Sequence, residues 1–202
     1  RVVCRIKPPI RSNTRITNDG KLLLTKIDKD IENKDKYSSK IFKLDKFYDD
    51  KSSNINIFNN EVSHLLNESF CLFLYGHTGS GKTYTLLGNN QNKGIIQILL
   101  EKIHFRCKIE ILELRPSGCY DLLNNQIVSL FENNNKTKIY NLSNREIKTK
   151  NEFQNILDII TKYRVKGISK HNLSSSRTHL IINIYNNNNK YTLIDLAGNE
   201  RS

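Results

Sequence analysis

The sequence predicts an α/β fold of three layers, in which helices cover both faces of a central mixed, mainly parallel sheet. Apolar segments typical of strands alternate along the chain with segments whose apolar residues have helical spacing. The run FCLFLY at 70–75 is apolar throughout, which is typical of a central strand buried on both faces. A glycine-rich loop follows this run directly and precedes a helical segment. We therefore expect one layered domain over residues 1–202.

The predicted elements follow from local patterns. Apolar and β-branched runs predict strands, and Pro8 and Pro9 end the first of them. The last two predicted strands are expected to form a hairpin across 186–190. Strands are predicted at 1–7, 22–25, 41–44, 70–75, 108–114, 127–131, 138–140, 180–185 and 191–196, and helices at 55–66, 94–104 and 151–163.

Composition limits the class of protein. The 202 residues include 32 Lys and Arg and 20 Asp and Glu, which gives a formal charge of +12. No apolar run approaches the ~20 residues of a membrane span, and no secretory signal precedes the first strand. The four cysteines form no C-x-x-C pair, so reduced thiols inside the cell are expected. Methionine is absent and the chain begins inside a predicted strand, so we expect an excerpt of a longer chain.

One motif predicts phosphate binding. Residues Gly76-His77-Thr78-Gly79-Ser80-Gly81-Lys82-Thr83 fit G-x-x-x-x-G-K-[ST] completely, between a predicted strand and a predicted helix. Glycines let the backbone N–H groups turn toward an anion, and the start of the helix adds partial positive charge. Lys82 can reach the β- and γ-phosphates, and the Thr83 hydroxyl can bind Mg²⁺. The motif predicts a nucleoside triphosphate bound with Mg²⁺.

Two later segments are candidates for contact with the magnesium ion and the γ-phosphate at this loop. Asp195 ends an apolar strand, where its carboxylate can act on Mg²⁺ through water, and Gly198 can bring its amide to the γ-phosphate. The segment Asn172–His179 places hydroxyls and Arg177 just before another predicted strand. Each pattern alone is common in proteins without this role.

The three segments together, in this order, resemble the kinesin motor domain. The family's nucleotide loop reads G-Q-T-G-S-G-K-T and its switches read N-x-x-S-S-R-S-H and D-L-A-G-S-E, against GHTGSGKT, NLSSSRTH and DLAGNE here. The opening R-x-R-P of kinesins is similar to RIKP at 5–8. The resemblance runs from Arg1 to Ser202 and implies a P-loop NTPase fold. Because a kinesin motor continues well past the position of Ser202, we expect the fold to be incomplete at its C-terminus.

The resemblance implies roles at the base of the nucleotide. Arg5, Lys7 and Pro8 would line the pocket for adenine and ribose, and Tyr84 would stack on the other side of the base. The loop residues 76–83 would hold the phosphates.

Further roles are implied at the terminal phosphate. Ser176 would join the magnesium site of the loop and Ser175 would touch the γ-phosphate, which Gly198 would sense. Arg177 would pair with Glu200, and Glu200 would help to take the proton from the attacking water. Loss of the γ-phosphate would release both switch segments.

The chain departs from the family pattern at three of these positions. His77 replaces Gln at a variable place in the loop, where little effect is expected. Lys7 keeps the charge of Arg without its planar fork. Asn199 replaces Ser beside the phosphate sensor, which affects the expected rate of hydrolysis more than binding.

Three functions remain open. The first is an ATP-dependent microtubule motor in the cytoplasm and cytoskeleton, at sites such as a spindle or axoneme, with homodimers formed through regions outside this chain. The second is a degenerate kinesin-like domain that binds nucleotide and partners but hydrolyses little. The third is a P-loop GTPase, although no N-K-x-D-type segment follows the loop. The positive charge suits acidic tubulin, and no nucleic-acid motif is recognised, so neither nucleic-acid nor membrane partners are expected.

Overall fold

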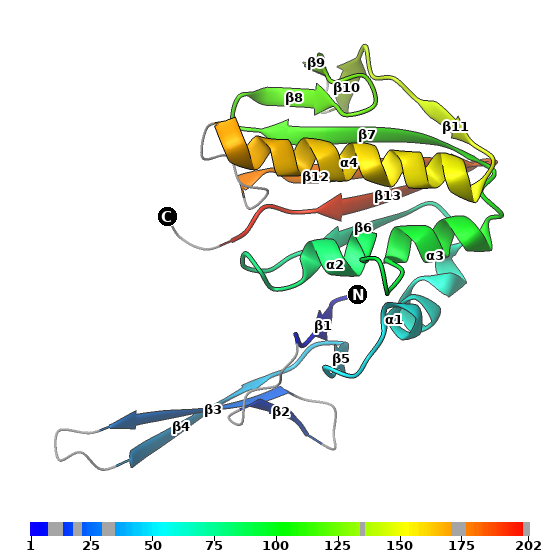
Figure 1. Cartoon of the computed structure of the whole chain (residues 1–202). Helices are drawn as coiled ribbons and strands as arrows, with labels where there is room; N and C mark the ends of the chain where they lie inside the picture. Colours follow the sequence, from blue (N-terminus) through cyan, green and yellow to red (C-terminus); the bar gives the residue numbers. More distant parts are fainter. Residues whose placement is uncertain (8–13, 18–21, 30–34, 134–135, 171–176, 200–202) are drawn as a thin grey trace. The chain divides into compact units, whose positions relative to one another are not determined.

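The computed structural model describes residues 1–7, 14–17, 22–29, 35–133, 136–170 and 177–199 (Figure 1). The chain forms two compact units, Arg1–Ile57 and Phe58–Ser202. Helix α1 (Asn54–Glu61) crosses the boundary between them. Each unit has its own sheet or sheets and is described by itself.

The first unit contains two small sheets. β1 (Val3–Arg5) pairs in parallel with β5 (Lys46–Tyr48), and the Phe47 and Tyr48 side chains are buried. β2 (Thr14–Ile16), β3 (Leu22–Lys29) and β4 (Asp35–Phe42) form an antiparallel sheet in that order. The strands predicted at 22–25 and 41–44 therefore belong to a longer pair than the sequence indicated.

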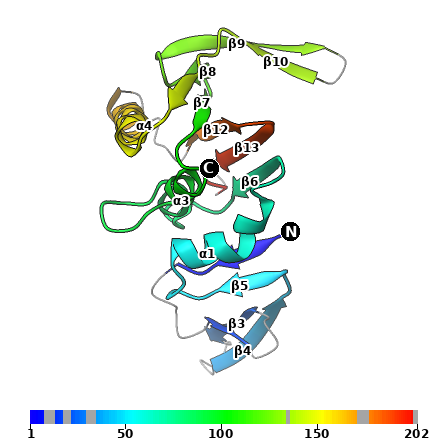
Figure 2. The same cartoon turned by 90° about the vertical axis from the view of Figure 1, so that its right-hand side faces the viewer.

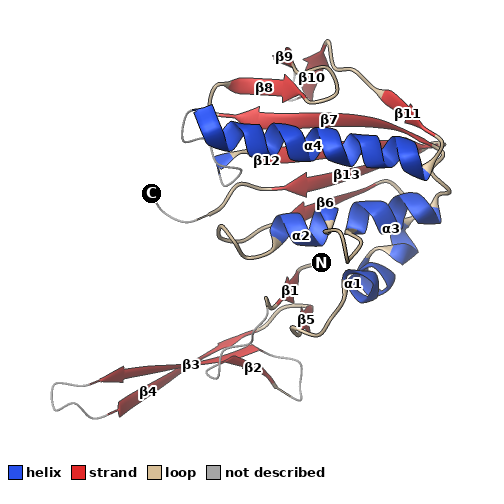
Figure 3. Cartoon of the chain, viewed as in Figure 1, coloured by secondary structure: helices blue, strands red, loops and turns tan. Residues whose placement is uncertain are grey.

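The second unit is built on one large sheet (Figure 3). Its strands lie in the order β10 (Lys136–Tyr140), β9 (Gln126–Asn133), β8 (Gly118–Asp121), β7 (Cys107–Arg115), β12 (His179–Asn186), β13 (Asn189–Asp195) and β6 (Phe70–Leu74), and β11 (Arg145–Ile147) also pairs with β7. Its helices are η1 (Ser63–Leu65, a 3₁₀ helix), α2 (Lys82–Leu87), α3 (Ile95–Lys102) and α4 (Lys150–Lys170).

The α/β class and the mixed sheet flanked by helices are confirmed, but the expected majority of parallel strands is corrected. Among the described strands of the large sheet, β13 and β6 pair in parallel and the other pairs are antiparallel. Most of these pairs are consecutive strands, because β7 to β10 follow one another through short turns, as do β12 and β13. Such connections allow only antiparallel neighbours.

The described helices α3 and α4 lie on the same face of the large sheet (Figure 2). Side chains between the helices and this face are fully buried, including Leu99, Ile111, Ile156, Ile182 and Leu193. Burial of this apolar surface stabilises the unit.

The strand predicted at 70–75 was expected to be buried on both faces, but its side on the opposite face of the sheet is open. Burial alternates along β6, and the side chain of Phe73 is 60% exposed. β6 is the last strand of the large sheet, and one of its faces is open, so it is not a central strand buried on both faces. Within the described part of the unit, the expected third layer of helices does not cover Phe73.

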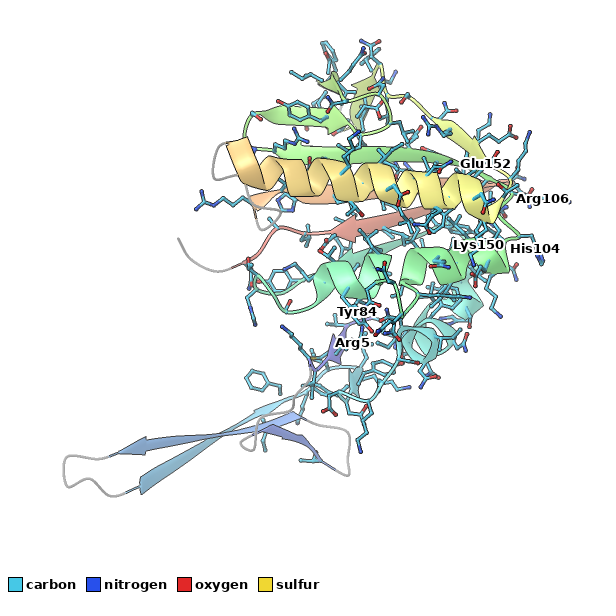
Figure 4. The ribbon with its side chains drawn as sticks, in the orientation of Figure 1. Arg5, Tyr84, His104, Arg106, Lys150 and Glu152 are labelled. Atoms are coloured by element: carbon cyan, nitrogen blue, oxygen red, sulfur yellow. The ribbon has the colours of Figure 1, made fainter. Side chains whose placement is uncertain are left out.

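Helix α4 begins with a capping box that the sequence analysis did not single out. The Glu152 N–H donates to Thr149 Oγ1 (3.2 Å), and Glu152 Oε2 accepts from the N–H groups of Thr149 (2.9 Å) and Lys148 (2.7 Å). The hydrogen bond from the Lys148 backbone is the main cause that lowers the pKa of Glu152. Figure 4 shows Lys150 and Glu152 at this first turn. The cap explains why the helix starts at Lys150, close to the predicted start.

The four cysteines are free thiols, as expected. Cys107 is buried at the start of β7, and its burial raises the pKa of the thiol to about 12, whereas Cys71 on the open face is exposed. No helix among the described residues is both long and apolar enough to cross a bilayer.

Candidate functional site

The site lies where two parallel strands end. β6 ends at Leu74, and the loop 76–81 connects it to α2, which begins at Lys82. β13 runs beside β6 with Asp195 opposite Leu74 (Figure 1). Because the carboxyl ends of parallel strands meet at one edge of a sheet, the predicted loop and the predicted Asp195 come together there.

The loop has the backbone shape that its glycines permit. Gly79 and Gly81 have φ angles of 76° and 97°, a region that residues with a Cβ rarely adopt. The Ser80 N–H donates to the His77 carbonyl oxygen (3.1 Å), which closes a turn. Gly76 has a φ angle of 152°, a backbone conformation that residues with a Cβ rarely adopt, so a glycine is favoured at the first position of the loop as well.

The Lys82 ammonium lies within this loop. Its Nζ donates to the carbonyl oxygens of Gly76 (2.7 Å) and His77 (2.9 Å). The side chain therefore folds back over the loop that precedes it, so its positive charge is at the place where the motif predicts phosphate.

Thr83 links the loop to the second motif. Its Oγ1 donates to Asp195 Oδ2 (2.6 Å), across 112 positions of sequence. Asp195 is fully buried, although a carboxylate is costly to bury without partners. A hydroxyl and a carboxylate this close provide the oxygen ligands that Mg²⁺ prefers, so the residues present fit the expected ion.

The segment after β13 is held from both sides. The Leu196 N–H donates to the Leu74 carbonyl oxygen on β6 (3.2 Å), and the Ala197 N–H donates to His179 Nδ1 on β12 (3.1 Å). Further along, Asn199 Nδ2 donates to the Tyr75 hydroxyl (2.7 Å). Residues 196–199 are thus connected to the strand that precedes the phosphate loop and to the strand that follows the first switch motif.

The start of β12 has a buried polar anchor. Thr178 is 3% exposed and its Oγ1 donates to Glu113 Oε1 (3.0 Å). Glu113 is also buried and its other oxygen accepts from Arg115 Nε (2.6 Å). The Arg115 guanidinium lies over the Tyr120 ring, 4.2 Å from its centre.

The residues predicted to contact the base lie in different units. Arg5 is on β1, where its guanidinium donates to Asn54 Oδ1 and to the Ser52 carbonyl oxygen (3.2 Å). Lys7 follows β1 and is exposed. Tyr84 is on α2 in the second unit (Figure 4). The predicted base pocket stays a prediction.

Several predicted residues lie outside the described ranges, namely Pro8, Ser175, Ser176 and Glu200. Arg177 is exposed just before β12, and Gly198 is half-buried after β13. Pairing of Arg177 with Glu200 therefore remains a prediction. His77 and Thr78 are exposed in the loop, and the ring Nδ1 of His77 donates to the Thr78 carbonyl oxygen (2.6 Å).

Sequence reasoning missed the side chains that hold the two switch segments. His179 closes the motif N-x-x-S-S-R-x-H and could have been singled out for that reason, although the motif alone does not reveal its partner. Tyr75 precedes the loop without a motif of its own. Glu113 and Arg115 lie in an ordinary strand pattern, so no local signal distinguishes them.

The family model described as the kinesin motor domain matches residues 5–202. "Kinesin-like protein KIN-10C" of Oryza sativa subsp. japonica is 31% identical over 191 residues, which is 84% of this chain and 33% of that protein. "Protein claret segregational" of Drosophila melanogaster is 29% identical over 90% of this chain and 30% of its own length. "Kinesin-like protein KAR3" of Saccharomyces cerevisiae is 28% identical over the whole chain and 34% of its own length.

The fold comparison agrees with the sequence comparisons. A solved structure of a fast kinesin superposes with a TM-score of 0.80 at 19% identity, over 98% of this chain and 65% of that one. The chain spans about a third of the length of the three relatives described above. The match over residues 5–202 shows that the chain belongs to the kinesin motor domain family.

Proposed function

We propose that the chain binds Mg-ATP at residues 76–83 and hydrolyses it as the nucleotide-binding part of a microtubule motor. The observation that carries this proposal is the hydrogen bond from Thr83 Oγ1 to the buried Asp195 Oδ2. It joins the phosphate loop to the second switch motif at one edge of the sheet. Membership of the family supports the ATPase class.

Thr83 would bind the magnesium ion directly, and Asp195 and Ser176 would complete its protein surroundings, Asp195 through water. The ion would neutralise charge on the phosphates. Lys82 would leave its loop carbonyl oxygens and donate to the β- and γ-phosphates. The glycine-rich backbone would orient the triphosphate for in-line attack.

The remaining roles concern the terminal phosphate. Ser175 and the Gly198 amide would contact it, and Arg177 would pair with Glu200 when both segments close. Glu200 would accept the proton of the attacking water through a water chain. Arg5, Lys7, Pro8 and Tyr84 would hold the base. This part of the proposal depends on the family motifs.

Microtubules are the proposed partner because the family implies them and because the formal charge of +12 suits an acidic surface. Coupling would arise when the switch segments change position with the γ-phosphate. The cytoskeleton is accordingly the proposed location.

A second candidate is a kinesin-like domain that binds nucleotide and hydrolyses little. Asn199 favours it, since its side chain donates to the Tyr75 hydroxyl and so adds a contact that restrains the second switch segment. This contact is made by the side chain that stands where the family has Ser, so slow hydrolysis would be traced to this position.

Steady-state ATPase assays on the full-length protein, with and without microtubules, distinguish the two candidates. A motor is expected to turn over ATP faster when microtubules are added, because filament binding is coupled to the nucleotide cycle. Saturable nucleotide binding with no turnover under either condition would support the second candidate. Turnover that microtubules leave unchanged would contradict the motor proposal.

A further inference from the structure

The strongest unassigned feature is the hydrogen bond between the two switch segments. The last paired residues of β12 and β13 are Leu180 and Asp195, so Ala197 lies beyond the ladder. Its N–H donates to a side-chain acceptor, His179 Nδ1, at 3.1 Å. The imidazole thus continues the contact between these two segments past the point where main-chain pairing ends.

The acceptor is held in place by its own strand. His179 pairs with Leu114 of β7, and its neighbour Thr178 donates to the buried Glu113. Arg115 in turn donates to Glu113. Because the hydrogen bond between Thr178 and Glu113 is buried, the start of β12 is held in place, and His179 is a fixed point against which the segment after β13 can be positioned.

The donor belongs to the segment expected to move. The preceding amide, that of Leu196, is bound to β6, and the following peptide contains the Gly198 N–H. Fixing the Ala197 N–H restricts rotation of the backbone that presents Gly198. The Ala197 N–H can only donate, so Nδ1 must be the acceptor, and a neutral His179 carries its proton on Nε2.

We propose that His179 is a positioning residue: its Nδ1 holds the Ala197 amide and thereby orients the Gly198 N–H for the terminal phosphate. This inference rests on the proposed function for its effect on hydrolysis. The hydrogen bond itself does not depend on the proposed function. The hydrogen bond and its effect on hydrolysis are tested by different measurements.

The chain supplies its own probe, because Ala197 is its single alanine. Labelling with ¹⁵N-alanine therefore gives one amide resonance, that of the proposed donor. With ¹⁵N-histidine added, a coupling across the hydrogen bond should connect the Ala197 nitrogen to His179 Nδ1 in the wild-type chain.

Two variants separate the acceptor from the bulk of the ring. His179→Leu keeps the branch at Cγ but is apolar and offers no acceptor, whereas His179→Asn places an oxygen on Cγ where Nδ1 stood. We expect the Ala197 resonance to move in His179→Leu and to return toward its wild-type position in His179→Asn. His64→Leu, at an exposed histidine in η1, is the matched control and should leave the resonance unmoved.

The rate of ATP turnover should change in the same variants as the Ala197 resonance. In His179→Leu we expect kcat to fall by about 3- to 10-fold, as loss of one positioning hydrogen bond predicts, with ATP affinity changed by less than about 2-fold. His179→Asn should recover most of kcat. A structural defect alone would lower the folded fraction without this split between kcat and affinity.

The possible results test the hydrogen bond, the positioning role and the proposed function separately. An Ala197 resonance that shows no coupling and does not move in His179→Leu overturns the hydrogen bond. A confirmed hydrogen bond with equal kcat in all three proteins overturns the positioning role. If the full-length wild-type protein has no ATPase activity, the proposed function fails, while the Ala197 resonance of this chain still decides whether His179 holds this segment.

Discussion

Replacing Lys82 with alanine is expected to weaken ATP binding by about 100-fold or more, because a charged hydrogen-bond donor to phosphate is lost. In the structure Nζ donates to the Gly76 and His77 carbonyl oxygens, so it is already within the loop that would receive the phosphates. Titration with a fluorescent ATP analogue measures the change in affinity.

Lys93→Ala provides the matched control for this experiment. It removes the same charge from an exposed lysine of the same unit, whose Nζ pairs with Glu101 at 2.7 Å. ATP affinity should be unchanged in Lys93→Ala, which excludes a general effect of net charge. Wild-type affinity in Lys82→Ala would mean that residues 76–83 do not bind the phosphates.

Replacing Glu200 with alanine is expected to leave ATP affinity nearly intact and to slow hydrolysis by about 10²- to 10³-fold, which is typical for loss of a general base. The reason is that Glu200 is proposed to act on the attacking water and not to bind the nucleotide. Single-turnover measurements of phosphate formation separate the chemical step from product release.

The control for Glu200→Ala is Glu68→Ala, at an exposed residue just before β6. Both changes remove one carboxylate, but Glu68 precedes the amino end of the strand and the phosphate loop follows its carboxyl end. Hydrolysis that proceeds at the wild-type rate in Glu200→Ala would show that another group, or water alone, takes the proton.

The parts of the site that depend on local sequence were predictable. The order strand, glycine-rich loop, helix around Lys82 has a direct physical reason, and so has Asp195 at the end of an apolar strand. The β12–β13 hairpin was predictable too, because two apolar runs lie on either side of a short asparagine-rich turn. These signals are contained within stretches of about ten residues.

Strand direction and strand position were harder to predict, because they depend on partners far away in the chain. The run at 70–75 is apolar on both faces, yet Phe73 is exposed on the open face of the last strand. When both faces of a strand are apolar, composition alone does not show which of them is buried. The strand β11 also escaped prediction because its pairing with β7 is long-range. The strand β8 follows β7 through a short turn, but its four residues are too few to show a strand pattern.

Side-chain contacts between distant segments were out of reach for the same reason. The motifs placed Thr83 and Asp195 at one edge of the sheet, and the 2.6 Å contact agrees with that expectation. By contrast, nothing in the sequence pairs Asn199 with Tyr75, or His179 with Ala197. Such contacts depend on the exact exit angle of each strand.

The central claim is that residues 76–83 bind the triphosphate of ATP together with magnesium. Calorimetric titration of the chain with ATP and with GTP, in magnesium and in EDTA, tests it most directly. We predict saturable binding at about one site per chain, tighter for ATP than for GTP and weaker when EDTA removes the metal, since the Thr83–Asp195 pair would hold it. Failure of ATP to bind saturably, or tighter binding of GTP than of ATP, would contradict the account.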